Sequence, residues 1–235
     1  MSLASSRMVI TGGATGIGLA TAQLAASRGA SVVLMGRTEA KLQAAVATIG
    51  SAASYQVLDV TDEKAVDLAF SSLGEFDHLV TCAAGVTIGA FAELDERAFR
   101  DFFEVKFWGQ YRAIRAALPR LSPEGSITLL SGYLYRKPSV GFSPFAAVNG
   151  AIEALVKVLA IELAPVRINA LAPGQIDTLR DTIGEEANRS RIGAAAAKLP
   201  LGRIGTPEEV AHAALFLAEN RFTTGITLDV DGGER

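Results

Sequence analysis

Short apolar runs alternate with longer amphipathic stretches along most of the chain, and this alternation limits the possible folds more than any other feature. Amphipathic stretches such as 19–27, 40–49 and 63–73 lie between runs that are apolar on successive residues, as strands buried on both faces require. These runs cover residues 8–10, 32–35, 79–80, 127–130, 168–171 and 226–228. We predict a doubly wound α/β fold, with a parallel sheet of about seven strands and helices on both faces.

The length of 235 residues suits one α/β domain of this kind, and no linker or repeat interrupts the chain. We therefore expect a single domain over residues 1–235. The segment from about 179 to 198 differs from the rest, because it is polar and helix-prone between two well-patterned elements. We interpret it either as a mobile lid on the substrate side or as an ordinary surface helix.

The composition argues against several classes of partner. A net charge of −3 gives no basic surface for nucleic acids or anionic membranes. Cys82 is the only cysteine, so no intramolecular disulfide or cysteine-based zinc site can form, and the two histidines are too isolated to bind a metal. The first apolar run starts too early to follow a signal peptide, and no stretch is convincingly membrane-spanning. We expect a cytoplasmic protein that binds no metal.

A glycine-rich turn joins the first apolar run to the first amphipathic stretch. Glycines let the chain turn sharply and let its backbone approach a pyrophosphate, whose charge then meets the free N–H groups of the following helix. The order of strand, glycine turn and helix is the context that supports such a site. The turn predicts cofactor contacts at Gly12, Ala14, Thr15, Gly16, Ile17 and Gly18.

The end of the second apolar run predicts which cofactor is bound. NAD-selective proteins of this type place an acid there, which accepts a hydrogen bond from the ribose 2′-hydroxyl. This chain has Gly36-Arg37-Thr38 instead. A carboxylate would repel a 2′-phosphate, whereas a guanidinium binds one bidentately. We therefore expect NADP(H) rather than NAD(H), with Arg37 and Thr38 as phosphate ligands. The alternative is that Arg37 is a solvated loop arginine.

Further landmarks resemble the short-chain dehydrogenase/reductase family in form and order. The spacing Thr-Gly-x-x-x-Gly-x-Gly is the family's form of the glycine turn. Asp59-Val60 is similar to its adenine-contacting pair, and residues 82–85 are similar to its Asn-Asn-Ala-Gly turn. Segment 173–178 resembles the nicotinamide loop, and 200–210 with 230–233 resembles the carboxyl-terminal signature. The resemblance implies cofactor contacts at Asp59, Val60, Ala83, Ala84, Gly85, Asn149, Pro173, Gly174, Ile176 and Thr178.

The family's catalytic set is Asn-Ser-Tyr-Lys, and this chain departs from it at all four positions. The resemblance places Lys106 at the asparagine position, Phe145 at the tyrosine and Asn149 at the lysine. Gly132 falls at the serine position. Phenylalanine has no proton to donate, so the usual acid–base step cannot run through residue 145.

The losses nevertheless have a pattern, because lysine and asparagine have exchanged places between positions 106 and 149. If both side chains reach the same volume, the ammonium is retained from the opposite side, and Asn149 still hydrogen-bonds the ribose. The alternative for Lys106 is a surface lysine. Ser131 is a further catalytic candidate, as a substitute for the missing serine if the loop shifts by one residue.

Two tyrosines in the same loop, Tyr133 and Tyr135, are possible replacement proton donors, and Tyr133 is the stronger candidate. Arg136 and Lys137 follow them, where they would lower a phenol pKa or receive an anionic substrate. The alternative is that the aromatic rings cap the core and both cations are solvated.

Two functions are compatible with these patterns. One is an NADP(H)-dependent oxidoreductase with a rebuilt active site, acting on a small molecule with a carbonyl, an alcohol or an activated double bond. The other is a catalytically silent NADP(H)-binding regulator or scaffold. The helix expected over 145–164 is apolar almost all round, so one side should face the sheet and the other a partner subunit, unless its own domain buries it. We expect a homo-oligomer, either a dimer or a tetramer.

Overall fold

The computed structural model describes residues 3–178 and 185–234. Its strands form one parallel sheet in the order β3-β2-β1-β4-β5-β6-β7, so the predicted doubly wound fold is confirmed. The strands are β1 (Arg7–Thr11), β2 (Ser31–Gly36), β3 (Ala53–Val57), β4 (Phe76–Thr81), β5 (Leu121–Leu130), β6 (Arg167–Pro173) and β7 (Thr227–Val230). The chain order reverses at β1, which lies between β2 and β4, and such a switch point opens a crevice at the carboxyl ends of the strands.

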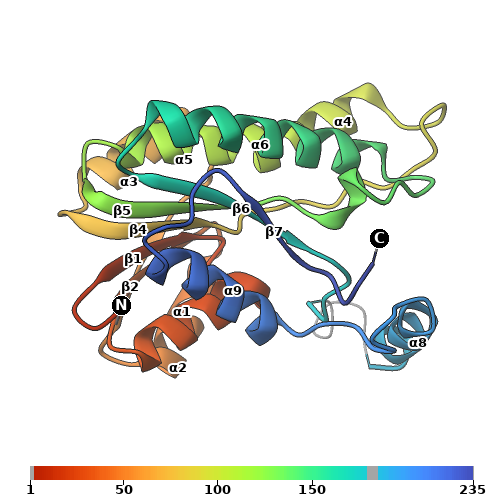
Figure 1. The fold of residues 1–235 in the computed structure, drawn as a ribbon, viewed down its shortest axis with the longest axis horizontal. Coiled ribbons are helices and arrows are strands. Elements are labelled where there is room, and N and C mark those ends of the chain that lie inside the picture. The colour runs from red at the N-terminus through yellow and green to blue at the C-terminus, as the bar shows by residue number, and fades with distance from the viewer. Residues whose placement is uncertain (1–2, 179–184, 235) are drawn as a thin grey trace.

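Helices cover both faces of the sheet (Figure 1). One layer holds α1 (Gly16–Ser27), α2 (Glu39–Ile49) and α9 (Pro207–Glu219). The other holds α3 (Glu63–Ser71), α4 (Glu96–Phe103), the π-helical turn η1 (Glu104–Trp108), α5 (Gly109–Ala117) and α6 (Ser143–Glu162). A short 3₁₀ turn, η2 (Tyr133–Tyr135), follows β5. Each layer encloses its own apolar core against the sheet.

The edge strand β3 is an element that the apolar runs do not predict. Its residues are half-buried or exposed, because it pairs with β2 on one side only. A strand at the edge of a sheet has no need of the continuous apolar sequence that a central strand requires. Conversely, the central strands β1 and β2 are almost wholly buried and coincide with predicted runs.

The predicted lid, residues 179–198, is described only in part. Its first part, 179–184, lies outside the described residues, and the remainder contains α8 (Glu185–Ala196). Figure 1 places α8 beyond the α1–α9 layer, at the same end of the molecule as the C-terminus. The buried side chain of Asn188 donates to Asp177 Oδ1 at 2.9 Å, which ties α8 to the loop after β6. Movement of this segment stays a prediction.

Helix α6 has two different faces. Val148, Ile152 and Val156 are fully buried on the inner face, within the core that covers the sheet. On the outer face Val158 is 51% exposed and Ile161 is 79% exposed, so its own domain does not bury this helix all round. The helix is long and apolar enough to cross a membrane, a property that core helices of soluble proteins share. Its covering by a partner subunit stays a prediction.

Candidate cofactor and active site

The glycine turn between β1 and α1 packs against the carboxyl end of β4. Gly12 has a φ of 69° and Gly16 a φ of 54°, backbone conformations that favour glycine. A Cβ atom on Gly12 would lie 2.5 Å from the backbone nitrogen of Ala83, and one on Gly18 would overlap the carbonyl oxygen of Gly12. Only glycine at these positions lets the turn close beneath the start of α1.

The N-terminus of α1 is open to an anion. Its N-cap, Thr15, makes no side-chain capping hydrogen bond in the described part of the chain, and the first turn contains no acid. The free N–H groups and the helix dipole therefore favour a negative group placed there.

A cleft of about 470 Å³ lies at the carboxyl ends of β1, β2 and β4. Most of the predicted cofactor residues line it, namely Gly12, Ala14, Thr15, Gly16, Ile17, Gly18, Arg37, Thr38, Asp59, Val60, Ala83, Ala84 and Thr178. The residues predicted by resemblance that do not line it are Gly85, Asn149, Pro173, Gly174 and Ile176. The lining residues that the sequence analysis missed are Met35, Gly36, Lys41, Leu58, Cys82, Val105 and Leu130.

Two cations stand at the β2 end of this cleft. Arg37 follows β2, and Lys41 lies in the first turn of α2, where its N–H donates to the carbonyl of Thr38 at 3.1 Å. Both side chains are exposed and line the cleft. Lys41 is three residues beyond Thr38, and this helical spacing places both residues on the same side of α2. The spacing could have predicted Lys41 from the sequence.

The structure brings Lys106 and Asn149 together. Lys106 is only 5% exposed, and its Nζ donates to Asn149 Oδ1 at 2.8 Å and to the carbonyl of Ser131 at 3.0 Å. Lys106 is therefore not a surface lysine. Burial lowers the pKa of its ammonium from 10.5 to about 7, because the charged form loses hydration. Both protonation states are accessible near neutral pH.

A π-helical turn carries Lys106 into this buried position. The turn η1 interrupts the run of helix between α4 and α5, and π-turns of this kind insert one extra residue into a helix. Gln110 Nε2 donates to the carbonyl of Lys106 at 2.7 Å, which satisfies an acceptor in this irregular turn. The neighbouring Val105 lines the cofactor cleft, whereas Lys106 does not.

Phe145 and Gly132 enclose the Lys106–Asn149 pair. The Lys106 Nζ lies 5.4 Å from the centroid of the Phe145 ring, within range of a cation–π interaction. Asn149 Nδ2 donates to the carbonyl of Gly132 at 3.0 Å, and a Cβ atom at position 132 would lie 2.9 Å from that nitrogen. The lack of a side chain at Gly132 therefore makes room for the Asn149 amide.

Of the two remaining catalytic candidates, Ser131 uses its hydroxyl in a hydrogen bond to another described residue, and Tyr133 does not. Ser131 is buried, and its Oγ donates to Glu153 Oε1 at 2.9 Å, which does not support its predicted role as the substrate serine. Tyr133 is half-buried, and its hydroxyl has no hydrogen-bond partner among the described residues. Burial and the charge of Glu234 raise the pKa of Tyr133 to about 12.

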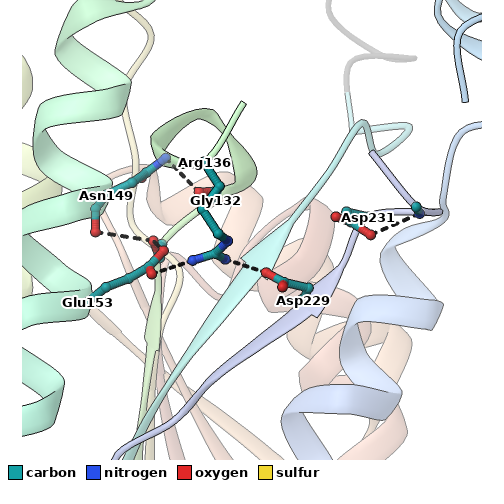
Figure 2. Close-up of polar contacts among 8 residues, drawn as sticks. Gly132, Arg136, Asn149, Glu153, Asp229 and Asp231 are labelled. Carbon is teal, nitrogen blue, oxygen red and sulfur yellow. Dashed lines mark hydrogen bonds and ion pairs between the residues drawn. The ribbon is translucent and has the colours of Figure 1, made fainter. Parts of the chain in front are cut away.

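The prediction that Arg136 lowers a tyrosine pKa is wrong. Its guanidinium is paired with the carboxylates of Glu153 and Asp229, and Figure 2 shows it between the two. A cation neutralised in this way neither favours a phenolate nor remains free for an anionic substrate. Lys137 is half-buried, and its predicted role stays a prediction. No cluster of three or more potential metal ligands occurs within residues 3–178 and 185–234.

Comparisons with known proteins show which family the chain resembles over most of its length. The family model described as enoyl-(acyl carrier protein) reductase matches residues 12–234. Short-chain dehydrogenase/reductase ATR9 of Stachybotrys chlorohalonatus is 30% identical over 96% of this chain and 95% of its own. Cis-4-hydroxycyclohexanecarboxylate dehydrogenase of Sinomonas cyclohexanicum is 36% identical, over 96% of this chain and 94% of its own.

The solved structures show the same likeness. A crystal structure of a small-chain dehydrogenase in complex with NADPH superposes with a TM-score of 0.82. That protein is 32% identical to this chain, and the alignment covers 98% of both. The chain belongs to the short-chain dehydrogenase/reductase family.

Proposed function

We propose that the chain is a cytoplasmic NADP(H)-dependent oxidoreductase whose active site is rebuilt around Lys106 and Asn149, acting on a small carbonyl compound or alcohol. The observation that carries this proposal is the buried ammonium 2.8 Å from the asparagine that replaces the family's lysine. A buried lysine without a directly bonded carboxylate among the described residues is costly to fold, so its presence beside a cofactor cleft favours a functional role.

The residues of the cleft fit NADP(H). The turn at Gly12 and Gly18 leaves space that a Cβ atom would fill, and the open N-terminus of α1 suits a pyrophosphate. Arg37 and Lys41 supply two positive charges where NAD-selective proteins place an acid, which suits a 2′-phosphate. The bound cofactor would donate or accept the hydride.

Tyr133 is the proton donor that we propose for reduction of a carbonyl. Its raised pKa keeps the phenol protonated at neutral pH, yet a phenol remains more acidic than an aliphatic alcohol, so proton transfer to a forming alkoxide is favourable. Asn149 holds the Lys106 ammonium, whose positive charge would stabilise negative charge developing on the substrate oxygen.

The test of this role is NADPH oxidation with a panel of aldehydes and ketones. We expect Tyr133→Phe to lower kcat by about 100-fold or more, the usual loss when a general acid is removed. Tyr135→Phe is the matched control, because Tyr135 is 53% exposed in the same loop, and it should leave turnover unchanged. Equal losses in both variants would exclude a specific role for Tyr133.

Cofactor choice is tested by calorimetric titration. We expect NADPH to bind more tightly than NADH, and Arg37→Asp to reverse the order, because a carboxylate repels the 2′-phosphate and accepts from a 2′-hydroxyl. Equal affinities of the unmodified protein for both cofactors would contradict the proposed NADP(H) specificity.

The covering of Lys106 by Phe145 favours a second candidate, a catalytically silent NADP(H)-binding regulator or scaffold. Phe145 has no hydroxyl, and Lys106 itself does not line the cleft. This function is indicated if NADPH binds at micromolar concentration and no carbonyl compound in the panel is reduced.

A further inference from the structure

Arg136 bridges two carboxylates that come from different elements. One guanidinium nitrogen is paired with Glu153 on α6 and the other with Asp229 on β7 (Figure 2). The side chain of Glu153 is only 8% exposed, whereas those of Arg136 and Asp229 are 37% and 32% exposed. The bridge therefore joins the loop after β5 to a helix on one side and to the last strand on the other.

The bridge continues by hydrogen bonds to the Lys106–Asn149 pair. Glu153 accepts a hydrogen bond from Ser131 Oγ at 2.9 Å, and the Ser131 carbonyl accepts one from Lys106 Nζ at 3.0 Å. The next carbonyl, that of Gly132, accepts from Asn149 Nδ2 at 3.0 Å (Figure 2). The backbone that holds both exchanged side chains is thus tied to an ion pair.

The ammonium of Lys106 has no directly bonded carboxylate among the described residues, and Glu153 is the one that reaches it through a single intervening residue. On its own turn, Glu104 is paired with Arg112 at 2.5 Å. The loop after β5 contributes the neutral phenol of Tyr133 and the cation Arg136, and β7 contributes Asp229, which is paired with that same cation. Glu153 and its partner Arg136 therefore lie behind the backbone that accepts the Lys106 ammonium.

We propose that Arg136 and Glu153 are positioning residues, which hold the backbone of Ser131 and Gly132 against Lys106 and Asn149 and balance the charge around the ammonium. The proposal rests on the proposed role of Lys106 in the active site. It assigns the arginine a task that its place in the sequence, beside two tyrosines, does not indicate.

Titration of Lys106 tests this proposal without any substrate. In protein labelled with ¹³C at lysine, the Lys106 signal is assigned by its loss in Lys106→Met, and its midpoint is expected near the value of about 7 that burial gives it. Arg136→Met leaves the charge of Glu153 uncompensated, so the midpoint should rise by about one pH unit. Glu153→Gln removes the carboxylate while Arg136 keeps its ion pair with Asp229, so the midpoint should fall, by less than it rises in Arg136→Met.

The opposite directions separate charge balance from mere structural damage, which would move both variants the same way. The double variant Arg136→Met with Glu153→Gln should return the midpoint toward that of the unmodified protein. Arg203 and Glu209 form the matched control, because this pair is exposed and lies in the segment before α9 and its first turn. Arg203→Met and Glu209→Gln change net charge equally and should leave the Lys106 midpoint in place.

Rescue by lysine tests the positioning role itself. Arg136→Lys retains the positive charge, but one ammonium does not reproduce the two-armed contact of the guanidinium with Glu153 and Asp229. The midpoint of Lys106 should therefore stay near that of the unmodified protein, while kcat of NADPH oxidation falls with little change in KM.

Unmoved midpoints in both single variants, or shifts in the same direction, would overturn the proposal. If Arg136→Met does not fold, the test depends on Glu153→Gln alone. A Lys106 midpoint that rises or stays unchanged in Glu153→Gln contradicts the proposal. Failure of the proposed function is recognised separately, because NADPH oxidation would then be absent while the lysine titration still reports on the pair.

Discussion

The two halves of the candidate site, the cofactor cleft and the Lys106 cluster beside it, are built in different ways. The half at β1 and β2 is made largely of backbone, with glycines that permit close approach and a helix N-terminus that presents N–H groups. The half at η1 and α6 is made of side chains and loop carbonyls from several elements, which meet around Lys106. The glycine turn of the first half resembles the family pattern, and the second half is where the sequence analysis expects departures from the family's catalytic set.

The difference shows what each kind of construction tolerates. A binding site made of backbone loses its space for the ligand when a Cβ atom is added, so few residue types are tolerated there. A side-chain cluster tolerates exchange when the same volume and hydrogen bonds are supplied from another direction. Lys106 and Asn149 are such a pair: Lys106 Nζ lies 2.8 Å from Asn149 Oδ1, and Gly132 leaves space for the Asn149 amide.

The largest effect should come from breaking the backbone half. A Cβ atom at residue 18 would overlap the Gly12 carbonyl oxygen, and this neighbour is backbone with little freedom to move. We expect Gly18→Ala to weaken NADPH binding by about 100-fold or more, comparable with the energy of overpacking a rigid site. Fluorescence titration of NADPH measures the loss.

The control for this substitution is Gly193→Ala in α8, where a Cβ atom meets nothing within 4 Å. It should leave NADPH affinity unchanged and slightly stabilise the helix, since alanine has the higher helix propensity. Similar NADPH affinities for Gly18→Ala and the unmodified protein would mean that the backbone half tolerates substitution after all.

The side-chain half, around Lys106, should respond to pH instead. The pKa of Lys106 is about 7 in the folded protein, below its ordinary value of 10.5, so between these values the unfolded chain binds more protons. Folding stability contributed by this group therefore rises with pH above 7 and is lost as the pH falls toward it. Relative to Lys106→Met, the unmodified protein should gain up to about 1.4 kcal/mol for each pH unit across this window.

Urea unfolding at several pH values between about 7 and 9 measures this gain. Lys64→Met, which removes an exposed lysine of α3, serves as the control and should follow the unmodified protein. A stability difference between the unmodified protein and Lys106→Met that stays constant with pH would show that Lys106 does not titrate in this window.

The same contrast explains what the sequence could predict. The glycine turn and the residues after β2 are contiguous, so spacing alone predicts most of the lining near Arg37, although Lys41 required the helix register of α2. The central strands were predicted from apolar runs, whereas β3 was missed because an edge strand needs no such run. Local chemistry was thus the reliable part.

The side-chain half depends on contacts between distant parts of the chain. The meeting of Lys106 and Asn149 followed from family resemblance, since no local pattern joins residues 43 positions apart. The Arg136 bridge spans 17 positions to Glu153 and 93 to Asp229. The sequence indicated an available cation beside two tyrosines, and the structure shows a paired one, because only the fold brings the carboxylates to it.

The smallest expected effect on the cleft concerns the outer face of α6, whose inner face carries Asn149 and Glu153. Ile161 is 79% exposed there, and we expect a second copy of the chain to cover it. Light scattering should give an oligomer for the unmodified protein and a smaller species for Ile161→Asp, because a buried unpaired carboxylate opposes association. Leu68→Asp, which alters an equally apolar and 70% exposed residue of α3, should leave the assembly intact.

NADPH affinity should change little in Ile161→Asp, because the backbone half of the site is built from β1, β2 and α1, on elements other than α6. A monomer of the unmodified protein at micromolar concentration would remove the partner subunit from this face and leave the exposed isoleucine without a packing role.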